Sequence, residues 1–599
     1  MHVMLLFPPN WTPAMPHLAL PTLTAFLRGH GIRVTQRDLN IEVFETILTR
    51  RYIERMLDRL RREYGPHAER RSARRVAPPR DLIIQALRSG PAIAARVERA
   101  KKVLRSPAFF DGPVGREALT TVIEALQIAS LPFFPAALEL GTYRPARTAD
   151  STHHILSEVR DPQVNMLIDL FARGILTDIE REQPDVVGIS IPSMAQMVPG
   201  LTIAALIKDR GLPCHVTVGG PHMTMLRERL IRSPGVFSLI DSVVIFDGEV
   251  PLLRLCEALA NGGDLSCVPN LIYRDGDTIR VTARKEPEKI GVLPTPDFDG
   301  LPLDRYLAPH LTLPLMSARG CYFGKCAFCN VGYGEAEHFS LMRSEMLAEQ
   351  MRALNRRYGT QHIFFSDEAL TPRTLRELSM ILHRDQAPIL WGGCARFEKT
   401  MTSDVLQQMY RGGCRMILFG LESASEAIMN RMIKGTKLEH MHRILRESTA
   451  AGIWNHTFFF FGFPGETIND AQQTVNFLYD HKEHIHSAAL GTFLLEIDAP
   501  AYRFPESFGI TKIIDPPEKD LAIYFDYEVS DGMDAAMAEL VETRFVETTP
   551  VKPFPQFYVN DVYRFLYACH LSRQGLPPPP LLARHEVAVA ARDGVLSTV

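Results

Sequence analysis

The chain has 599 residues, and its 66 basic and 69 acidic side chains leave a formal charge of only -3. This balance gives no overall field to attract nucleic acid or an acidic membrane surface, so we expect neither as a partner. The N-terminal run MHVMLLFPP lacks the basic start of a signal peptide, and no apolar stretch reaches the roughly 20 residues that span a bilayer. We therefore expect a cytoplasmic protein that folds as about three units.

Residues 1–265 alternate short β-type runs with helical patterns, which predicts a doubly wound, Rossmann-like α/β domain. The strand candidates are HVMLLF, IRVTQRDL, DVVGISIPS, HVTVGGPH and SVVIFD. Between about 41 and 177 the strand runs stop and the pattern is helical, which predicts a helical insertion inside this domain. A proline-rich stretch follows. Because proline disfavours helix interiors and central strands, we expect residues 266–310 to be an extended linker.

Residues 311–501 contain six further strand candidates separated by helical patterns, which predicts a partial (β/α)6 barrel of the TIM type. These candidates are LTLPLMSARG, HIFFSD, ILWGGCAR, RMILFGLES, HTFFFFGFPG and AALGTFLLEI. In such a barrel the chemistry lies at the carboxyl ends of the strands. The periodicity weakens in residues 502–599, where we expect a small helical C-terminal cap and a tail.

Three of the nine cysteines, Cys321, Cys326 and Cys329, lie within nine consecutive positions just after a predicted strand. Thiolates at this spacing suit an iron–sulfur cluster or zinc. A structural zinc site normally takes four protein ligands, and the nearest fourth candidate is the distant His338. A cluster held by three thiolates leaves one iron open to a substrate. We favour the cluster, with zinc and unliganded thiols as the alternatives.

The cysteine segment RGCYFGKCAFCN resembles the radical S-adenosylmethionine (SAM) superfamily, whose signature places an aromatic residue directly before the last cysteine. Phe328 occupies that position, although four residues rather than the usual three separate the first two cysteines. Further motifs follow at the ends of successive predicted strands, in the order of the family. They are SerAspGluAla at 366–369, Arg396, GlyLeuGluSer at 420–423 and GlyPheProGlyGlu at 462–466.

This resemblance implies that the three cysteines hold a [4Fe–4S] cluster, which opens SAM to a 5′-deoxyadenosyl radical. It also implies that Arg396 meets the SAM carboxylate and that Glu422 meets its ribose or amino group. Ser423 and Glu368 are further candidates for SAM contacts, and Phe328 for packing against the adenine. For each residue the alternative is an ordinary polar or aromatic side chain at a barrel rim.

The N-terminal domain resembles the cobalamin-binding domain that precedes many radical SAM barrels. Glycines at strand ends let the backbone approach a phosphate or nucleotide tail, of cobalamin or of another nucleotide. His222 is expected to be structural, because the sequence lacks the DxHxxG element that supplies a histidine to cobalt. The resemblance suggests Gly219, Gly220 and Gly248 for the tail, Ser193, Met194 and Gln196 for the lower face of the corrin, and Glu249 for a hydrogen bond.

These features lead us to expect a cobalamin-dependent radical SAM methyltransferase that methylates an unactivated carbon of a natural product or peptide. The resemblance also implies an electron donor such as a flavodoxin or ferredoxin. One alternative keeps the cofactors but ends in oxidation, cyclisation or ring rearrangement without methyl transfer. A second is a corrinoid-binding sensor or carrier whose cluster is structural.

Overall fold

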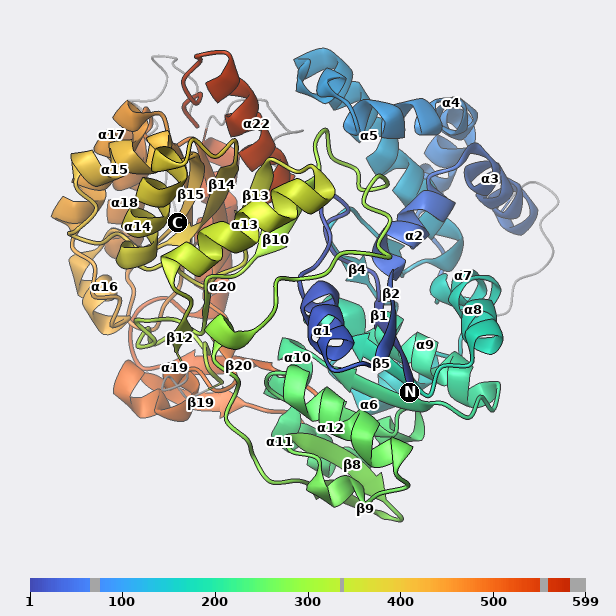
Figure 1. Cartoon of the computed structure of the whole chain (residues 1–599). Coiled ribbons are helices and arrows are strands. Elements are labelled where there is room, and N and C mark those ends of the chain that lie inside the picture. The colour runs from blue at the N-terminus through green and yellow to red at the C-terminus, as the bar shows by residue number, and fades with distance from the viewer. Residues whose placement is uncertain (65–75, 334–338, 550–558, 582–599) are drawn as a thin grey trace. The chain divides into compact units, whose positions relative to one another are not determined.

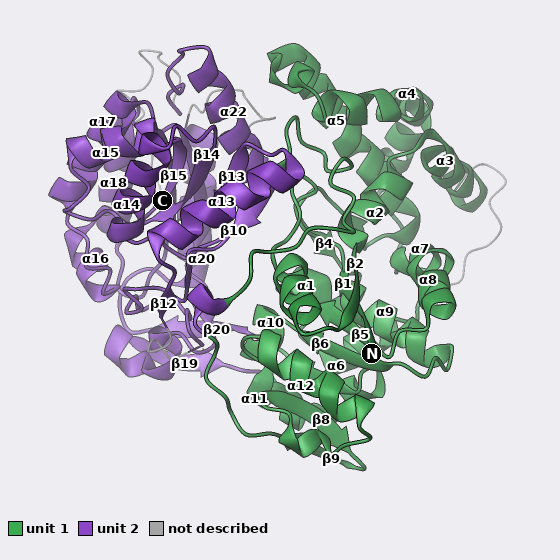
Figure 2. Cartoon of the chain, viewed as in Figure 1, with its two compact units in different colours: residues 1–288, 293–311, 516–522 green, residues 289–292, 312–515, 523–599 purple. Residues whose placement is uncertain are grey.

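The structure is a computed structural model of the chain and describes residues 1–64, 76–333, 339–549 and 559–581. The chain divides into two compact units. Unit 1 contains residues 1–288, 293–311 and 516–522, and unit 2 contains residues 289–292, 312–515 and 523–599 (Figure 2). Within the described residues, no helix is both long and apolar enough to cross a membrane.

Unit 1 is built on a seven-stranded sheet in the order β2-β1-β5-β6-β7-β8-β9. The first five strands in this order are parallel, and the three at its centre are almost wholly buried. This confirms the doubly wound α/β fold. The strands are β1 (His2–Phe7), β2 (Arg33–Asp38), β5 (Val186–Ser190), β6 (His215–Gly219), β7 (Ser242–Val244), β8 (Leu271–Asp275) and β9 (Thr278–Val281).

The hairpin β8–β9 corrects the expectation of an extended linker at 266–310. Its strands pair antiparallel and extend the sheet beyond β7. The signal was the pair Gly276-Asp277, which forms the two-residue turn between the paired residues Asp275 and Thr278, and Gly followed by Asp favours such hairpin turns. Gly276 has φ 60°, as such a turn requires. The prolines that suggested a linker lie farther along the chain.

The predicted insertion between β2 and β5 is helical. It also contains a short antiparallel pair, β3 (Ala137–Leu138) and β4 (Tyr143–Arg144). Figure 1 shows the long helices α3, α4 and α5 packed together in unit 1. The α-helices of the insertion are α2 (Leu39–Ile47), α3 (Arg50–Tyr64), α4 (Arg80–Leu104), α5 (Gly112–Ser130), α6 (Thr152–Glu158), α7 (Leu167–Arg173) and α8 (Ile175–Glu182). The other helices of unit 1 are α1 (Ala19–Gly29), α9 (Met197–Asp209), α10 (Pro221–Met225), α11 (Arg227–Arg232) and α12 (Glu249–Ala260).

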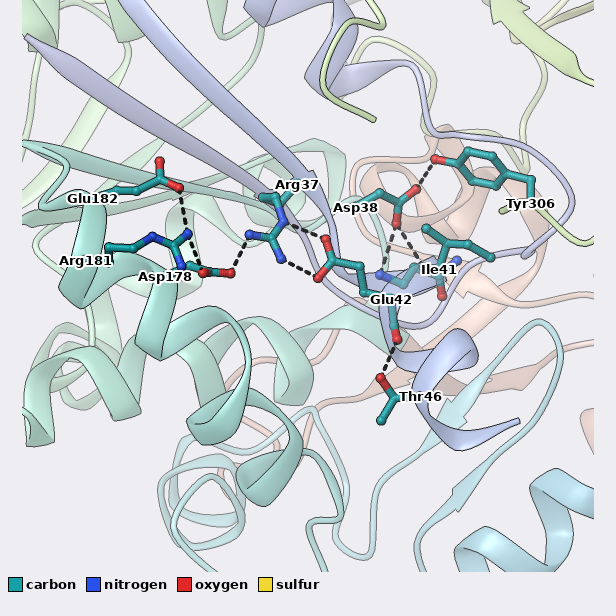
Figure 3. Close-up of polar contacts among 10 residues, drawn as sticks. Arg37, Asp38, Ile41, Glu42, Thr46, Asp178, Arg181, Glu182 and Tyr306 are labelled. Atoms are coloured by element: carbon teal, nitrogen blue, oxygen red, sulfur yellow. Dashed lines mark hydrogen bonds and ion pairs between the residues drawn. The ribbon is translucent and has the colours of Figure 1, made fainter. Parts of the chain in front are cut away.

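A buried network joins the end of β2 to the start of the insertion (Figure 3). Asp38 caps α2 by accepting hydrogen bonds from the backbone of Asn40 and Ile41, and the Tyr306 hydroxyl donates to its other oxygen at 2.6 Å. Arg37 pairs with Glu42. Burial raises the pKa of Asp38 to about 6, although these three hydrogen bonds lower it.

The change Tyr306→Phe is expected to lower the free energy of unfolding of unit 1. It removes a hydrogen bond to a buried carboxyl group, which is worth roughly 1.5–3 kcal/mol when the acceptor is charged. Folding raises the pKa of Asp38 from 3.8 to about 6. The stability that comes from protonation of this carboxyl group is therefore fully present below pH 3.8 and is lost as the pH rises through about 6. Urea unfolding of both proteins at pH 5 and pH 7.5 measures the difference. A variant as stable as the parent at pH 7.5 would contradict the expectation.

Unit 2 contains the predicted partial barrel. Six parallel strands follow the order β10-β13-β14-β15-β16-β17, with at least one helix between each pair of successive strands. All six predicted strands are present. They are β10 (Thr312–Leu315), β13 (His362–Phe365), β14 (Leu390–Ala395), β15 (Cys414–Glu422), β16 (Trp454–Phe461) and β17 (Ser487–Thr492). The helices are α13 (Ser344–Tyr358), α14 (Pro372–Arg384), α15 (Ser403–Arg411), α16 (Glu426–Arg431), α17 (Leu438–Ala451) and α18 (Ile468–Asp480).

The C-terminal segment contains more than the expected helices. An antiparallel sheet in the order β18-β20-β19 accompanies α20 (Ala535–Thr548) and α22 (Asp561–Arg573). Its strands are β18 (Leu495–Glu496), β19 (Ile510–Ile514) and β20 (Tyr524–Val529). Residues 516–522 belong to unit 1, where Asp520 accepts hydrogen bonds from Thr152. Most of the expected tail, from 582, lies outside the described residues.

Candidate active site

The three cysteines lie on a loop at the carboxyl end of β10, between the paired strands β11 (Ala318–Arg319) and β12 (Ser340–Leu341). All three side chains are partly exposed. Gly320 and Gly324 have φ values of 74° and 57°, a left-handed conformation that lets the loop turn tightly around its first cysteine. The thiols therefore stand at the end of the barrel where the chemistry was predicted.

A buried carboxylate fixes the start of this loop. Asp367, just after β13, accepts hydrogen bonds from the backbone nitrogens of Ser317 at 2.9 Å and Ala318 at 2.8 Å, and from the Ser317 hydroxyl. Burial raises the pKa of Asp367 to about 7, although these donors lower it. Asp367 was not among the predicted site residues, because within the motif at 366–369 only Glu368 was expected to contact SAM.

The middle of the loop is tied to two other segments of unit 2. The Ala327 nitrogen donates to the Met432 carbonyl at 2.8 Å, and the Ala327 carbonyl accepts from Ala501 at 2.9 Å. A tight turn connects the last two cysteines, where the Cys329 nitrogen donates to the Cys326 carbonyl at 3.1 Å. These bonds hold the thiol positions by backbone contacts rather than by side-chain packing alone.

The donor set fits an iron–sulfur cluster, because three soft, partly exposed thiols share one loop with cationic groups beside them. Burial raises the pKa of Cys326, while Lys434 and Arg396 lower it. Within the described part of the chain, no three His, Cys, Asp or Glu side chains converge on a single-ion site. His338, the fourth ligand that zinc would need, lies outside the described residues.

Arg396, at the end of β14, is almost fully buried against the cysteine loop. Its guanidinium lies over the Phe323 ring at 3.7 Å from the centroid, and Nη1 is 3.6 Å from the Cys326 sulfur. Nη2 donates to the Lys434 carbonyl. The structure thus brings Arg396 to the cysteines, but most of its contacts organise the loop. A link through Glu398 to the Tyr322 hydroxyl adds a further anchor.

Glu422 ends β15 at a bulge, with φ 62°, and pairs with Lys434 at 2.7 Å in a nearly buried position. The Lys434 ammonium also lies 5.6 Å from the centroid of the Phe328 ring. Lys434 was missed, because no sequence motif connects the segment after α16 to the end of β15. The pair places opposite charges directly beside the cysteine loop.

The other predicted SAM contacts differ in accessibility. Ser423 is fully buried, with its hydroxyl 3.3 Å from that of Thr474, so its position suits support of the strand end. Glu368 is exposed just after β13, although desolvation by the surrounding protein raises its pKa. Phe328 packs edge-on against Phe460 at 5.3 Å between ring centroids.

The loop after β16 is held by another buried carboxyl group. Glu466 accepts a hydrogen bond from the Gly462 nitrogen at 2.5 Å, and burial raises its pKa to about 8. Gly462 has φ 87°, and its carbonyl accepts from the Tyr527 hydroxyl at 3.3 Å. The motif at 462–466 therefore forms a compact turn at the same end of the barrel as the cysteines.

In unit 1, the predicted cobalamin contacts share the carboxyl edge of the sheet. They follow the neighbouring parallel strands β5, β6 and β7, next to the point between β1 and β5 where the strand order reverses. Ligands of open α/β sheets bind at such points. A Cβ atom on Gly220, which has φ 115°, would lie 2.9 Å from the Ile191 carbonyl oxygen. Ser193, Met194, Gly219, Gly220 and Gly248 are partly exposed there.

Two of these predicted residues are buried. Gln196 is fully buried and accepts a hydrogen bond from the Ser193 hydroxyl at 2.6 Å, while Glu249 is 3% exposed. Gln196 therefore supports Ser193 rather than presenting its own surface. His222 is also fully buried, and burial lowers its pKa to about 3, in keeping with a structural role.

Comparison with known proteins matches residues 315–478 to the radical SAM superfamily. The chain is 29% identical in sequence to an uncharacterized methyltransferase from Pyrococcus horikoshii. The aligned region covers 52% of this chain and 67% of the relative. The chain is 23% identical, over 55% of its length and 60% of the relative, to the anaerobic magnesium-protoporphyrin IX monomethyl ester cyclase of Rubrivivax gelatinosus.

Two solved structures share the fold. The cobalamin-dependent SAM radical enzyme OxsB, solved with aqua-cobalamin and SAM, matches with a TM-score of 0.51 at 17% identity, over 67% of this chain and 64% of OxsB. The radical SAM methyltransferase TsrM from Kitasatospora setae, solved with cobalamin and a [4Fe–4S] cluster, matches with a TM-score of 0.51 at 15% identity, over 83% of this chain and 76% of TsrM.

A radical SAM domain uses a [4Fe–4S] cluster and SAM, and the cysteine loop, the barrel and the family match coincide in residues 315–478. The sensor or carrier alternative is therefore not retained. Residues 315–478 of the chain thus form a radical SAM domain, and the chain shares its fold with the cobalamin-binding radical SAM enzymes OxsB and TsrM.

Proposed function

We propose that the chain is a cobalamin-dependent methyltransferase that transfers a methyl group to an unactivated carbon of a small-molecule or peptide substrate. The observation that carries the proposal is the presence, in one chain, of the cysteine loop on a radical SAM barrel and an accessible strand-end edge on a Rossmann-like sheet. The Pyrococcus horikoshii relative, which is named as a methyltransferase, supports the choice of reaction.

When bound, the cluster and SAM supply a radical that removes hydrogen from a carbon, and cobalamin supplies the methyl group. In the proposal Cys321, Cys326 and Cys329 hold the cluster, and a flavodoxin- or ferredoxin-type protein supplies the electron. Arg396 and Asp367 fix the cysteine loop. Glu422, paired with Lys434, and the accessible Glu368 are placed to orient the polar groups of SAM.

Ser193, Met194, Gly219, Gly220 and Gly248 would contact cobalamin, because their exposed backbone and small side chains allow a close approach at the switch edge. The buried side chains of Gln196 and Glu249 would not contact cobalamin but would support the loops that do. His222 is sealed in the core, so we expect cobalamin to bind without this histidine as a ligand.

The first test supplies anaerobically produced protein with cobalamin, a reductant and SAM labelled with deuterium in its methyl group. We expect about four irons and about one cobalt per chain. We also expect labelled methyl groups in the product formed from candidate substrates. Iron without bound cobalt, under conditions that load a known cobalamin enzyme, would remove the cobalamin step.

A second outcome is a turned-over product that contains no label. The cyclase from Rubrivivax gelatinosus, similar over about half of this chain, gives a reason to look for it. Such a product would replace methyl transfer with radical oxidation, cyclisation or ring rearrangement, while leaving the roles of the three cysteines unchanged.

A further inference from the structure

The strand register identifies which side chains face the interior of the barrel in unit 2. Asn455 on β16 faces outward, because its side-chain nitrogen donates to the Leu445 carbonyl of the crossover helix α17 at 3.1 Å. Its neighbour His456 therefore faces inward, since side chains alternate along a strand. Parallel pairing puts Leu418, Cys394 and Ser487 on the same inner face as His456.

The C-terminal helix α22 occupies this interior. Phe565 packs against His362 and Phe364 on β13, with ring centroids 6.2 and 5.5 Å away, and it is the side chain nearest to a Cβ built on Gly392. Tyr567 packs against Trp454, the first residue of β16. The helix thus fills the amino-terminal part of the barrel.

The helix runs antiparallel to the strands. Arg573, its last residue, donates to Gln361, which lies just before β13 begins. At the other end, Asp561 and Arg564 are close enough to His456 to influence its pKa, although burial is the larger cause. The amino-terminal turn of α22 therefore points up the barrel towards the cysteine end.

Asp561 lies near two strands, β14 and β16, whose inner faces line this interior on either side of β15. Asp561 lies about one helical turn before Phe565, which packs on Gly392 of β14, and its carboxylate adds to the rise that burial causes in the pKa of Cys394 on the same strand. Its side chain is 35% exposed, while its ion-pair partner Arg564 is 10% exposed. Asp561 is thus an accessible carboxylate beneath the level of the cysteine loop.

The inner face above Asp561 has an aromatic wall beside small residues. Phe458 pairs with Ala489 and Phe460 with Gly491. A Cβ atom built on Gly491 would have no other atom within 4 Å, so space adjoins the Phe460 ring there. Along β14, Arg396 at the cysteine loop is two residues beyond Cys394, which corresponds to roughly 7 Å.

We propose that Asp561 is a specificity-determining residue that binds an amine of the substrate, whose apolar body lies along Phe458 and Phe460. The proposal rests on the proposed function, because it assumes that the substrate enters this barrel. A carboxylate accepts hydrogen bonds and favours a cation, and an amine supplies both. The substrate class is therefore a small molecule or side chain with an aromatic or apolar body and a terminal amine.

The test compares two probes, tyramine and 4-ethylphenol, which share an aromatic body and differ by the amine. Their dissociation constants for the cluster-loaded enzyme are measured by saturation-transfer NMR. A charge-assisted hydrogen bond is worth about 1.5–3 kcal/mol, so we expect tyramine to bind at least about tenfold more tightly. The change Asp561→Asn should remove most of this preference, and Asp561→Glu should keep part of it.

The matched control is Asp526→Asn, the same charge change at an exposed position on β20 in the same unit. It should keep the preference for tyramine. Equal binding of both probes by the parent enzyme, or an unchanged preference in both Asp561 variants, would overturn the proposal. Iron content measured on each variant shows that the barrel is intact. The assay needs neither cobalamin nor turnover, so its failure is distinguishable from failure of methyl transfer.

Discussion

The Cys326→Ala enzyme is expected to contain almost no iron and to form no 5′-deoxyadenosine above the background of the reductant. In the proposed function Cys326 supplies one of three protein thiolates for the cluster, and its sulfur lies 3.6 Å from the Arg396 guanidinium. Two remaining thiolates on one loop leave a second iron without a protein ligand, so the cluster should be lost during purification. Iron and sulfide analysis, the absorption spectrum and chromatography of the SAM products measure the effect.

The matched control is Cys267→Ala, which removes an exposed thiol from unit 1. This variant should keep the iron content and the SAM cleavage of the parent. Full iron content in Cys326→Ala would mean that the cluster has other ligands. Zinc in place of iron in the parent protein would revive the alternative that the thiol chemistry allows.

Most of the fold followed from periodicity, because buried parallel strands appear as short apolar runs separated by helical patterns. HVMLLF became β1 and HTFFFFGFPG became β16, each with close bounds. The hairpin β8–β9 was missed because nearby prolines outweighed the local turn signal of Gly276-Asp277. The strands β19 and β20 are short and half exposed, so they carry little hydrophobic pattern.

The position of the candidate site could be predicted from the three cysteines, because closely spaced thiols indicate a metal or iron–sulfur site from the sequence alone. Asp367 and Lys434 could not be predicted, because their importance lies in contacts between distant segments. Asp367 binds backbone fifty residues away, and Lys434 pairs across twelve residues with Glu422. Such pairings depend on strand order, which periodicity does not specify. Burial, likewise visible only in the fold, separates the supporting Gln196 from the accessible Ser193.

The change Lys434→Met is expected to destabilise the barrel strongly. The Lys434 and Glu422 side chains are only 5% and 11% exposed and lie 2.7 Å apart. Removing the ammonium leaves a carboxylate buried without its partner, which typically costs about 3–5 kcal/mol. Trp391 and Trp454 are fully buried in the barrel, so urea unfolding followed by tryptophan fluorescence reports on this unit.

A second change separates loss of a charge partner from loss of packing. In Lys434→Met combined with Glu422→Gln, neither member of the pair carries a charge, so most of the lost stability should return. Lys512→Met, which breaks the exposed pair with Glu528, should cost less than about 1 kcal/mol. If the double variant is as unstable as Lys434→Met, the lysine stabilises the barrel through its packing on Phe328. If Lys434→Met is as stable as the parent, the pair is not needed to hold the site together.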